Sequence, residues 1–438
     1  MLSAVLLFQQ TAFAAEPGVI NSGDTTFVLF STALVFLMTI GLAFFYGGMV
    51  RRNNVLNTLM NTFFMIALIS IQWIFFGYSL SFGPDKGGLI GGLQWLGLQG
   101  VGGAPNLAYA ATIPHLAFMG YQMMFAIITP ALITGAFAER IRFSALVIFV
   151  LLWSTLVYDP LAHWVWGVNG WLRNLGALDF AGGTVVHVSS GIAGLVAAIV
   201  IGKRKQYGAI SMLPHNLPFV LLGAGLLWFG WFGFNAGSAL SANEVAVYAF
   251  INTNTAAAAA VISWVFIEWI RYGKPTLLGA ATGAVVGLVA ITPAAGFVTP
   301  ISAILIGLLV SPICYYAISI IKAKFGYDDS LDAFGCHGVG GIWGAIATGL
   351  FATKTVNAAG GNGLFYGDAT QFGVQLLSVA VTIILSALLT FMILKIMQLF
   401  MPLRVSETDE EEGLDATQHG EEAYTDMSTE KGIQIPLY

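Results

Sequence analysis

Two histidines, His187 and His337, lie inside apolar, glycine-rich stretches of the sequence. A buried pair of imidazoles stays neutral, because charging one ring in a low-dielectric interior is costly and charging both adds repulsion. One nitrogen of a neutral ring donates a hydrogen bond and the other accepts one. Such a pair offers an apolar channel a few polar points for a small neutral solute, or a relay for a proton. The alternative is that each ring packs separately and bonds to a carbonyl group.

The chain that carries these histidines has the composition of a membrane protein. It is 57% hydrophobic and 9% charged, and apolar runs of about 20 residues, the length that crosses a bilayer core, recur along it. These runs do not alternate in polarity as barrel strands do, so helices are expected. The sequence therefore predicts an all-α polytopic membrane protein with eleven transmembrane helices. The predicted spans are 27–50, 55–82, 114–138, 143–162, 180–201, 214–237, 248–270, 276–292, 299–321, 333–352 and 371–400.

Basic residues predict the orientation of the spans, because cytoplasmic loops are rich in lysine and arginine. Most of them fall in alternate loops or after the last span: Arg51, Arg52, Arg140, Arg142, Lys203, Arg204, Lys205, Arg271, Lys274, Lys322, Lys324 and Arg404. The opposite side has only Lys86, Arg173 and Lys354. We therefore expect a multi-pass protein of the cell membrane with its N-terminus outside and its C-terminus in the cytoplasm.

The ends of the chain differ in character from the predicted transmembrane domain, residues 24–401. Residues 1–23 form an external N-terminal segment that is either a signal peptide or an uncleaved stretch lying on the membrane. Residues 402–438 contain ten of the 22 acidic residues and form a cytoplasmic tail, either a regulatory segment or a solvated extension. The two cysteines, Cys314 and Cys336, are far apart in sequence and support neither a disulfide framework nor a metal site.

A weak internal repeat surrounds the two histidines. The segments DFAGGTVVH (179–187) and DAFGCHG (332–338) each place an aspartate, then glycine, then histidine at the start of a span. Because they are five spans apart, they enter the membrane from opposite faces, as in two inverted five-helix repeats followed by a final helix. Chance similarity between glycine-rich helices is the alternative.

Aromatic residues and a hydroxyl form a second group of candidates. Trp166, in the predicted external loop HWVWG, can hold a cation over its ring, although tryptophan also anchors proteins at membrane interfaces. Phe125 and Phe234 either line a pore or belong to the core. Ser238 offers an oxygen to a cationic donor or caps a helix. Asp179 precedes a helix, and we expect it to stabilise the unpaired N–H groups there.

Six longer motifs carry a family resemblance. They are FFYGGMVRRNNVLN (44–57), GAFAERIRFSA (135–145), GALDFAGGTVVHVSSGIAGLV (176–196), GWFGFNAGS (230–238), FGCHGVGGIWG (334–344) and EGLDATQHGEEAY (412–424). Together they resemble the Amt/Mep/Rh ammonium transporter family over nearly the whole chain. Retention of Trp166 and Ser238 indicates the Amt branch, because Rh-type members lack this pair.

The resemblance implies a homotrimer of eleven-helix subunits, each with its own pathway, that takes ammonium or methylammonium. By similarity, Trp166, Ser238, Phe125 and Tyr121 are the external recruitment site; Phe125 and Phe234 are the gate; His187 and His337 line the pore; and Asp179 organises the external site. Tyr121 stands where some relatives have phenylalanine. The tail resembles the segment through which PII-type signalling proteins act on relatives.

We therefore expect a transporter in a lipid bilayer, with no catalytic residue, cofactor, metal or nucleic-acid partner. Ammonium is recruited outside, deprotonated near the phenyl gate and conducted as ammonia past the histidines. An ammonium sensor that signals through its tail is the alternative. An intramembrane metalloenzyme is disfavoured, because a third ligand is missing beside the two histidines and catalytic zinc usually needs three.

Overall fold

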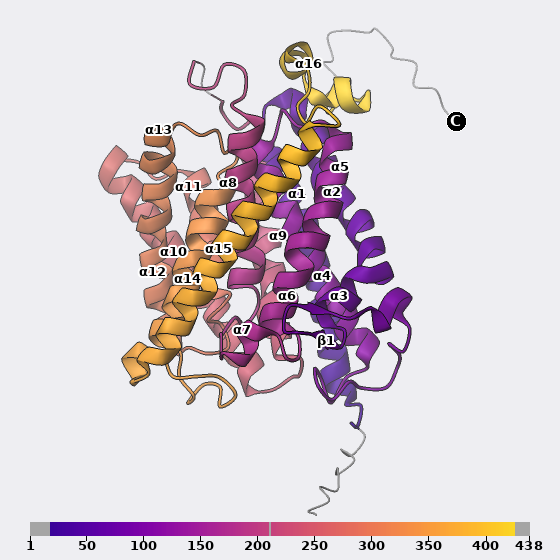
Figure 1. Ribbon diagram of the computed structural model, residues 1–438. Helices are drawn as coiled ribbons and strands as arrows, with labels where there is room; N and C mark the ends of the chain where they lie inside the picture. Colours follow the sequence, from indigo (N-terminus) through magenta and orange to yellow (C-terminus); the bar gives the residue numbers. More distant parts are fainter. Residues whose placement is uncertain (1–17, 210–211, 425–438) are drawn as a thin grey trace, which may run out of the picture.

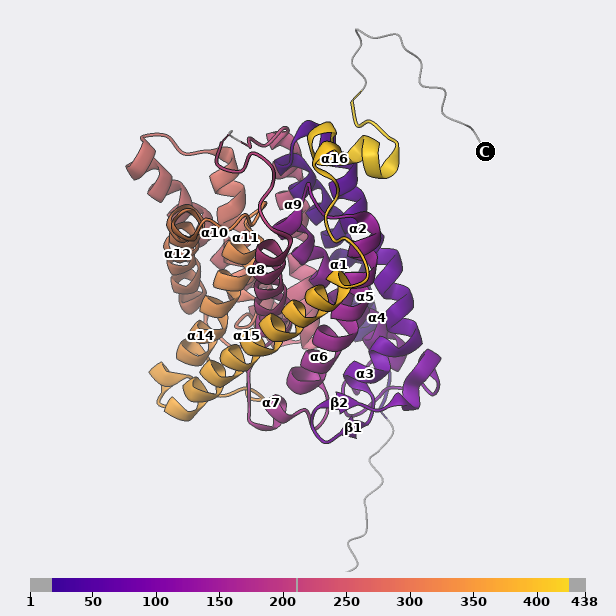
Figure 2. The same cartoon turned by 45° about the horizontal axis from the view of Figure 1, so that its top comes forward.

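The apolar stretches form long helices that pack side by side in one bundle (Figures 1 and 2). The structure is a computed structural model that describes residues 18–209 and 212–424. The helices are α1 (Ser22–Met49), α2 (Val55–Gln72), α3 (Tyr78–Phe82), α4 (His115–Ile133), α5 (Phe143–Trp153), α6 (Asp159–Trp166), α7 (Trp171–Asn174), α8 (Ser189–Ile201), α9 (Leu217–Ala236), α10 (Glu244–Tyr272), α11 (Leu277–Ile291), α12 (Pro300–Tyr316), α13 (Lys322–Phe325), α14 (Gly340–Phe351), α15 (Ala369–Gln398) and α16 (Glu407–Glu412).

Shorter elements continue or connect these helices. The π-helical segments are Trp73–Gly77, Ser154–Tyr158, Gly183–Val188, Ala317–Ile321, Phe334–Val339 and Asp415–His419. The 3₁₀ segments are Arg52–Asn54, Leu93–Leu98, Thr134–Phe137, Gly237–Ala239 and Leu364–Tyr366. One small antiparallel hairpin pairs β1 (Asp85–Lys86) with β2 (Ile90–Gly91).

Polar side chains in the sequence determine where several long helices begin. The side chain of Asn243 accepts a hydrogen bond from the backbone N–H of Ala246 at the start of α10. Thr299, which precedes Pro300, caps α12 in the same way, and Asp368 caps α15. These residue types satisfy N–H groups that have no partner inside the helix. These three spans thus have a physical reason to start near their predicted residues.

Within residues 18–209 and 212–424, nine helices are long and apolar enough to cross a membrane. They coincide with nine of the predicted spans, which confirms a helical polytopic membrane fold. The remaining predicted spans, 276–292 and 333–352, coincide with two shorter helical stretches. These are α11, with 15 residues, and the segment Phe334–Val339 continued by α14.

The fourth span is longer than predicted. The sequence predicts that it ends at residue 162 and that Trp166 lies in a loop, but one helical stretch runs from Phe143 to Asn174. The reason is that apolar side chains continue past residue 162, and Val165 is buried against the bundle. Trp166 is therefore the last residue of α6. This places it on a rigid element.

Irregular turns recur in spans that are five apart. The fourth and ninth spans contain the π-helical segments Ser154–Tyr158 and Ala317–Ile321. The fifth and tenth spans begin with Gly183–Val188 and Phe334–Val339. π turns are rare, so two matched pairs support the internal repeat that the sequence suggested.

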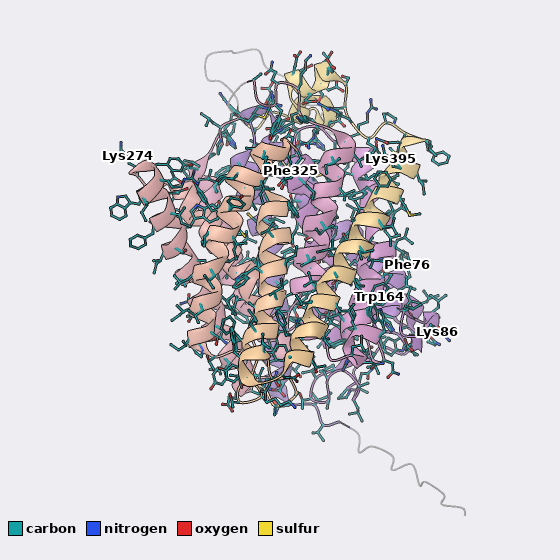
Figure 3. All side chains as sticks on the ribbon, turned by 60° about the vertical axis from the view of Figure 1, so that its left-hand side comes forward. Phe76, Lys86, Trp164, Lys274, Phe325 and Lys395 are labelled. Atoms are coloured by element: carbon teal, nitrogen blue, oxygen red, sulfur yellow. The ribbon has the colours of Figure 1, made fainter. Side chains whose placement is uncertain are left out.

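The basic loops gather at one end of the bundle, together with the tail. Figure 3 shows Lys274 and Lys395 near the end that carries α16, and Lys86 toward the other end. The chain after α15 joins this end, because the backbone N–H of Arg142 donates to the carbonyl of Leu403 at 2.9 Å. Lys274 and Arg142 therefore lie at the end of the bundle that carries the tail.

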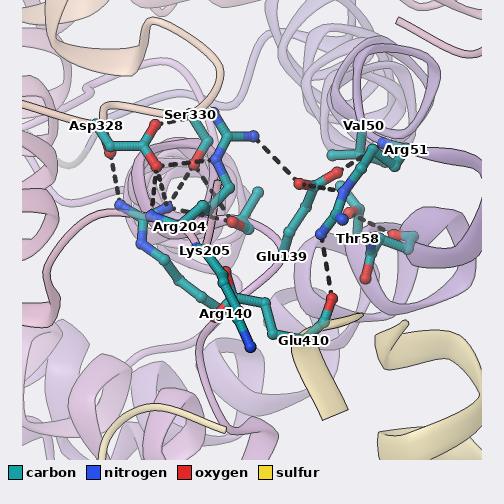
Figure 4. A network of polar contacts seen from close by, with 12 residues as sticks. Val50, Arg51, Thr58, Glu139, Arg140, Arg204, Lys205, Asp328, Ser330 and Glu410 are labelled. Carbon is teal, nitrogen blue, oxygen red and sulfur yellow. Dashed lines mark hydrogen bonds and ion pairs between the residues drawn. The ribbon is translucent and has the colours of Figure 1, made fainter. Parts of the chain in front are cut away.

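A buried ionic network connects these loops (Figure 4). Glu139 Oε2 lies 3.0 Å from Nε of Arg51 and 3.2 Å from Nη1 of Arg204. Arg204 also reaches Asp328, with Nη2 2.8 Å from Oδ1. Burial raises the pKa of Asp328, but the bonds from Arg204 and the charge of Arg140 together lower it below its ordinary value. The network therefore holds several separate loops through paired charges.

Up to residue 424, the tail is not a solvated extension. It is part of this network. Glu410 of α16 is 1% exposed. Its Oε1 accepts a hydrogen bond from the backbone N–H of Lys205 at 2.6 Å, and its Oε2 lies 2.6 Å from Nη2 of Arg404. The rest of the predicted tail, 425–438, and residues 1–17 of the predicted N-terminal segment lie outside the described residues.

Removing one member of this network tests its contribution to stability. We expect Asp328→Asn to lower the free energy of unfolding by about 3–5 kcal/mol at neutral pH, because Arg204 and Arg140 stay buried with less counter-charge. A lowered carboxyl pKa stabilises the fold above about pH 4, and this contribution is lost as the pH falls through the lowered value. The difference in thermal unfolding between wild type and variant should therefore shrink in acid.

The control is Glu407→Gln, whose carboxylate pairs with Lys205 but is 79% exposed. Exposed pairs contribute about 0–1 kcal/mol, so this variant should unfold like the wild type. An unchanged unfolding temperature for Asp328→Asn at neutral pH would contradict the stabilising role of the network.

Candidate functional site

Both histidines lie in π-helical segments at the start of a span. His187 belongs to Gly183–Val188, which leads into α8, and His337 belongs to Phe334–Val339, which leads into α14. A π turn holds one residue more than an α turn, and such turns often occur at functional sites. The fold therefore gives the two histidines the same local backbone.

A buried aspartate caps each of these segments. The carboxylate of Asp179 accepts hydrogen bonds from the backbone N–H groups of residues 182, 183 and 184, at 2.8, 2.6 and 2.7 Å. The carboxylate of Asp329 accepts them from residues 333 and 334, at 3.1 and 2.8 Å. Burial raises the pKa of both carboxyl groups, and the hydrogen bonds they accept oppose that rise. An acid at a helix N-terminus satisfies unpaired donors and the positive end of the helix dipole.

The second cap corrects the register of the predicted repeat. The sequence comparison aligned Asp179 with Asp332, but Asp329 is the residue that caps its helix. Asp179 and Asp329 each precede their histidine by the same number of residues. Asp332 has a left-handed backbone, with φ 57°, and its Oδ1 lies 2.7 Å from Nζ of Lys322. The aspartate that the motif comparison matched to Asp179 is thus paired with a lysine and does not cap the helix.

The structure brings the two histidine rings together. Their centroids lie 5.3 Å apart with an angle of 18° between the ring planes, so the rings are stacked. Trp231 stacks on His187 with centroids 5.4 Å apart. Both ring nitrogens of His187 and Nδ1 of His337 have no hydrogen-bond partner. The alternative of two separate rings, each bonded to a carbonyl, does not describe this arrangement.

Small residues permit this approach. Gly191 of α8 faces the backbone of Gly338, and a Cβ atom at position 191 would overlap that backbone. A Cβ at Gly341 would lie 3.0 Å from Cβ of His187. Close packing of glycines lets helix backbones touch. The two segments therefore meet at the depth of the histidines.

A narrow apolar cavity adjoins the rings. It has a volume of about 10 Å³, which is enough for a single molecule the size of water. The residues that line it are Met38, Leu42, Ile128, Leu132, Val186, His187, Leu227, Trp231, Phe234 and His337. The ring nitrogens without partners are thus the polar atoms of an otherwise apolar cavity.

A wider cavity of about 410 Å³ lies on the other side of two phenyl rings. Phe125 lines the wide cavity and Phe234 lines the narrow one. Their rings stack with centroids 4.2 Å apart. The stacked pair therefore separates the two cavities.

The other predicted site residues surround the wide cavity. Trp166, Ser238 and Asp179 line it. Nε1 of Trp166 donates to the backbone carbonyl of Asp179 at 2.9 Å, and the ring of Trp166 lies edge-on to Phe125 with centroids 5.9 Å apart. Ser238 Oγ donates to the carbonyl of Phe234 at 2.9 Å and lies 3.2 Å from the Tyr121 hydroxyl, which leaves at least one lone pair of Oγ free. On this side, the wide cavity therefore presents ring faces and neutral oxygens held in fixed positions. We call this part of the cavity the mouth.

Tyr121 occupies a different place from the one predicted. It is fully buried and does not line the wide cavity. Its hydroxyl lies 2.8 Å from the carbonyl oxygen of Phe234 and 3.2 Å from Ser238 Oγ. The reason is that it packs behind Ser238, Phe234 and Phe125, with its ring centroid 5.0 Å from that of Phe125.

Sequence reasoning missed three residues around these cavities. Gln122 lines the wide cavity, and its Oε1 is buried without a partner. Arg173 also lines it and donates from Nη1 to the carbonyl of Trp166 at 2.7 Å. Trp231 lies in the motif GWFGFNAGS, three residues before Phe234. Gln122 and Trp231 each lie one helical turn before a predicted phenylalanine, Phe125 and Phe234. Helical periodicity would therefore have placed them on the same helix face as those rings.

A third pocket lies beyond His337. It has a volume of about 210 Å³, and its lining includes Cys336, Asp332 and Glu268. Cys336 is the neighbour of His337 in the sequence. The wide cavity, the phenyl pair and the histidine cavity thus follow one another, and the third pocket is lined by the sequence neighbour of His337.

Comparison with known proteins gives the site a context. Residues 26–424 match the family described as the Ammonium Transporter Family. The chain belongs to the ammonium transporter family. An ammonium transporter of Bacillus subtilis (strain 168) is 59% identical over 404 residues, which cover 92% of this chain and 99% of that protein.

Solved structures of family members have the same fold. The crystal structure of Saccharomyces cerevisiae Mep2 is 37% identical, with a TM-score of 0.83 and 88% of both chains covered. A structure titled "Sensor Amt Protein" is 30% identical, with a TM-score of 0.82, and covers 91% of this chain and 98% of that chain. The resemblance that the motifs carried is therefore confirmed.

Adding one methyl group at Gly191 tests the close contact of the two helical segments that brings the histidine rings together. We expect Gly191→Ala to destabilise the fold by about 1–3 kcal/mol or more, because the added Cβ overlaps the backbone of Gly338, which cannot rotate away. Gly225→Ala in α9 is the control, because a Cβ there meets no atom within 4 Å. Thermal unfolding of the purified proteins measures both. Equal stability of the two variants would show that the backbones are not in contact.

Proposed function

We propose that this family member transports ammonium by holding the cation at the wide cavity, removing its proton near the phenyl pair and passing ammonia beside the two histidines. The observation that supports this most is the stacked pair of rings, whose unpartnered nitrogens adjoin an apolar cavity with room for one small molecule. Ammonia both donates and accepts hydrogen bonds, so it matches neutral imidazoles.

Recruitment rests on Trp166, Phe125 and Ser238. The two ring faces attract a cation by about 0.5–2 kcal/mol, depending on its desolvation. A free lone pair of Ser238 Oγ accepts a hydrogen bond from the cation. Tyr121 supports Ser238 from behind, and Asp179 organises the adjacent helix start. Binding of this moderate strength suits conduction, which needs a substrate that also leaves.

Discrimination against other cations follows from the narrow cavity. A potassium ion has no proton to give up and would have to enter as a charge. In an apolar cavity of about 10 Å³ the ion would lose its hydration, at a cost of several kcal/mol or more. Ammonium avoids this cost because it can cross as the neutral molecule.

The arrangement in the membrane is also a proposal. The two shorter helical stretches complete eleven spans in two inverted repeats of five plus α15, with the N-terminus outside and the basic loops and tail in the cytoplasm. The protein then sits in the cell membrane as a homotrimer and takes methylammonium as well as ammonium. The docked tail is the surface on which a PII-type signalling protein would act.

A second candidate function is ammonium sensing. The likeness to the structure titled "Sensor Amt Protein" favours it, as does the tail, which contacts Arg51 and Lys205 in two different loops. In this case occupancy of the wide cavity would alter the tail, and flux would be incidental. The two functions differ in whether the tail is needed for uptake.

The histidine pair can be tested by a double-mutant cycle. We expect His187→Ala to slow methylammonium uptake at least about tenfold, because the cavity loses its polar contact, which corresponds to about 1.4 kcal/mol of barrier. If the rings act together, adding His337→Ala should slow uptake by less than the product of the two single effects. Uptake into vesicles with equal amounts of protein is the measurement. Normal flux in His187→Ala would remove the pair from the mechanism.

Truncation after residue 402 separates transport from sensing. A transporter should still take up methylammonium at a rate comparable to that of the full chain, because every residue that lines the wide cavity and the narrow cavity lies before that point. A sensor should lose its signal. Uptake and a nitrogen-response reporter are measured in the same cells. Retained signalling with lost uptake would contradict both assignments.

A further inference from the structure

His163 is buried in α6, one turn before Trp166, and both of its ring nitrogens face acceptors. Nδ1 lies 2.9 Å from the backbone carbonyl oxygen of Ser81, and Nε2 lies 2.9 Å from Oδ1 of Asp85. A carbonyl only accepts hydrogen bonds, so Nδ1 carries a proton. A neutral ring would then turn a bare lone pair toward the carboxylate.

Asp85 is placed to remain ionised. Its Oδ1 also accepts a hydrogen bond from the backbone N–H of Gly88 at 2.7 Å, and its side chain is 19% exposed at the edge of β1. The hydrogen bond with His163 lowers the pKa of Asp85. An ionised Asp85 requires a proton on Nε2 as well. Both nitrogens of His163 are then protonated, and the ring is an imidazolium paired with Asp85.

The surroundings accommodate a cation at this position. His163 lies in the last turn of α6, where the negative end of the helix dipole favours positive charge. The other ionisable groups around α6 are Tyr78, Lys86, Tyr109, Tyr158, Asp159, Arg173 and His187. Asp159, one turn earlier, accepts bonds from Gln72 and Ser81 instead. Among the described residues, only the Asp85 side chain bonds to the ring.

This ion pair joins three elements at the end of α6 that carries Trp166. The ring ties α6 to the carbonyl of Ser81 in α3 and to Asp85 in β1. The His163 carbonyl accepts from the backbone N–H of Gly167 at 2.9 Å, which closes the helix directly after Trp166. A side chain added at Gly167 would collide with the ring. The placement of the Trp166 ring therefore depends on this pair.

We propose that His163 and Asp85 form a positioning pair for the cation site, so that affinity for ammonium responds to pH on the Trp166 side of the membrane. The proposal rests on the proposed function, in which Trp166 holds the cation. Loss of the imidazolium proton breaks the bond to Asp85, frees the end of α6 and weakens the contact between the cation and Trp166. Neither residue touches the substrate.

The first test is the dependence of KM on external pH in proteoliposomes of the full chain, with labelled methylammonium expressed as the concentration of its cation. In the wild type, KM should rise about two- to fivefold when the external pH is raised until His163 loses its proton. This is the loss of affinity expected when the contact between a cation and a ring weakens. The maximal rate should change less than twofold. A purely structural defect would lower the amount of active protein and leave KM unchanged.

Asp85→Asn should abolish this rise in KM, because an amide accepts a hydrogen bond from a protonated Nε2 and donates one to a bare Nε2. Asp85→Glu should restore the wild-type profile. Lys86→Gln is the matched control, since it changes an exposed charge beside Asp85 without touching the ring. An identical profile for Asp85→Asn and wild type would overturn the proposal.

The second test does not depend on transport. Nitrogen NMR of isotope-labelled histidine in the lipid-embedded protein, with His163→Gln for assignment, reports whether both ring nitrogens carry protons at neutral pH. Two protonated nitrogens are expected, and a neutral ring would overturn the ion pair. If Trp166→Leu leaves KM unchanged while the imidazolium is present, the recruitment site fails and the proposed link to affinity fails with it.

Discussion

The structure depends on one constraint, namely that polar atoms inside an apolar bundle need partners. Almost every polar group near the histidines has one. The hydroxyls of Ser189 and Ser190 bond back to carbonyls of their own helix, and Nε1 of Trp231 donates to Thr292. Both ring nitrogens of His187 and Nδ1 of His337 are exceptions, together with a few other buried atoms such as Oε1 of Gln122. Because an unpartnered buried polar atom costs free energy, their persistence supports a role in contacting something that passes.

That exception is possible because both helix starts are secured elsewhere. Asp179 and Asp329 satisfy the free N–H groups of the two segments, so neither histidine is needed as a cap. Glycines at the crossing then remove the side chains that would separate the rings. The ionic network around Arg204 fixes the loops at the end that carries the tail, where Glu139, Arg204 and Asp328 are buried as paired charges. Rigidity at that end allows the rings to be held by packing alone.

Hydropathy alone predicted the spans well, because the length of an apolar helix follows directly from the thickness of the bilayer. It failed where apolar residues continue past the membrane boundary, as in α6, since burial against protein and burial in lipid have the same sequence signal. Similarity selected Trp166, Ser238 and the phenylalanines. The structure brings Trp166, Ser238 and Phe125 to the wide cavity, with Phe234 stacked on Phe125. Asp329 was missed because three acids lie close together in this segment, and only backbone geometry shows which one accepts from the helix start. Tyr121 was misplaced because its neighbour on the helix, Gln122, faces the cavity instead.

The wide cavity treats charge differently from the ionic network, and the proposed cation site gives a reason for this difference. At the mouth, the carboxylate of Asp179 is saturated by backbone N–H groups, so its pull on a cation in the cavity is offset by donors that lie closer. What remains for the cation is ring faces and a serine oxygen. A bare carboxylate there would bind the cation too firmly for release. Asp179 therefore serves the site best by organising the helix behind it, because the mouth then attracts a cation without trapping it.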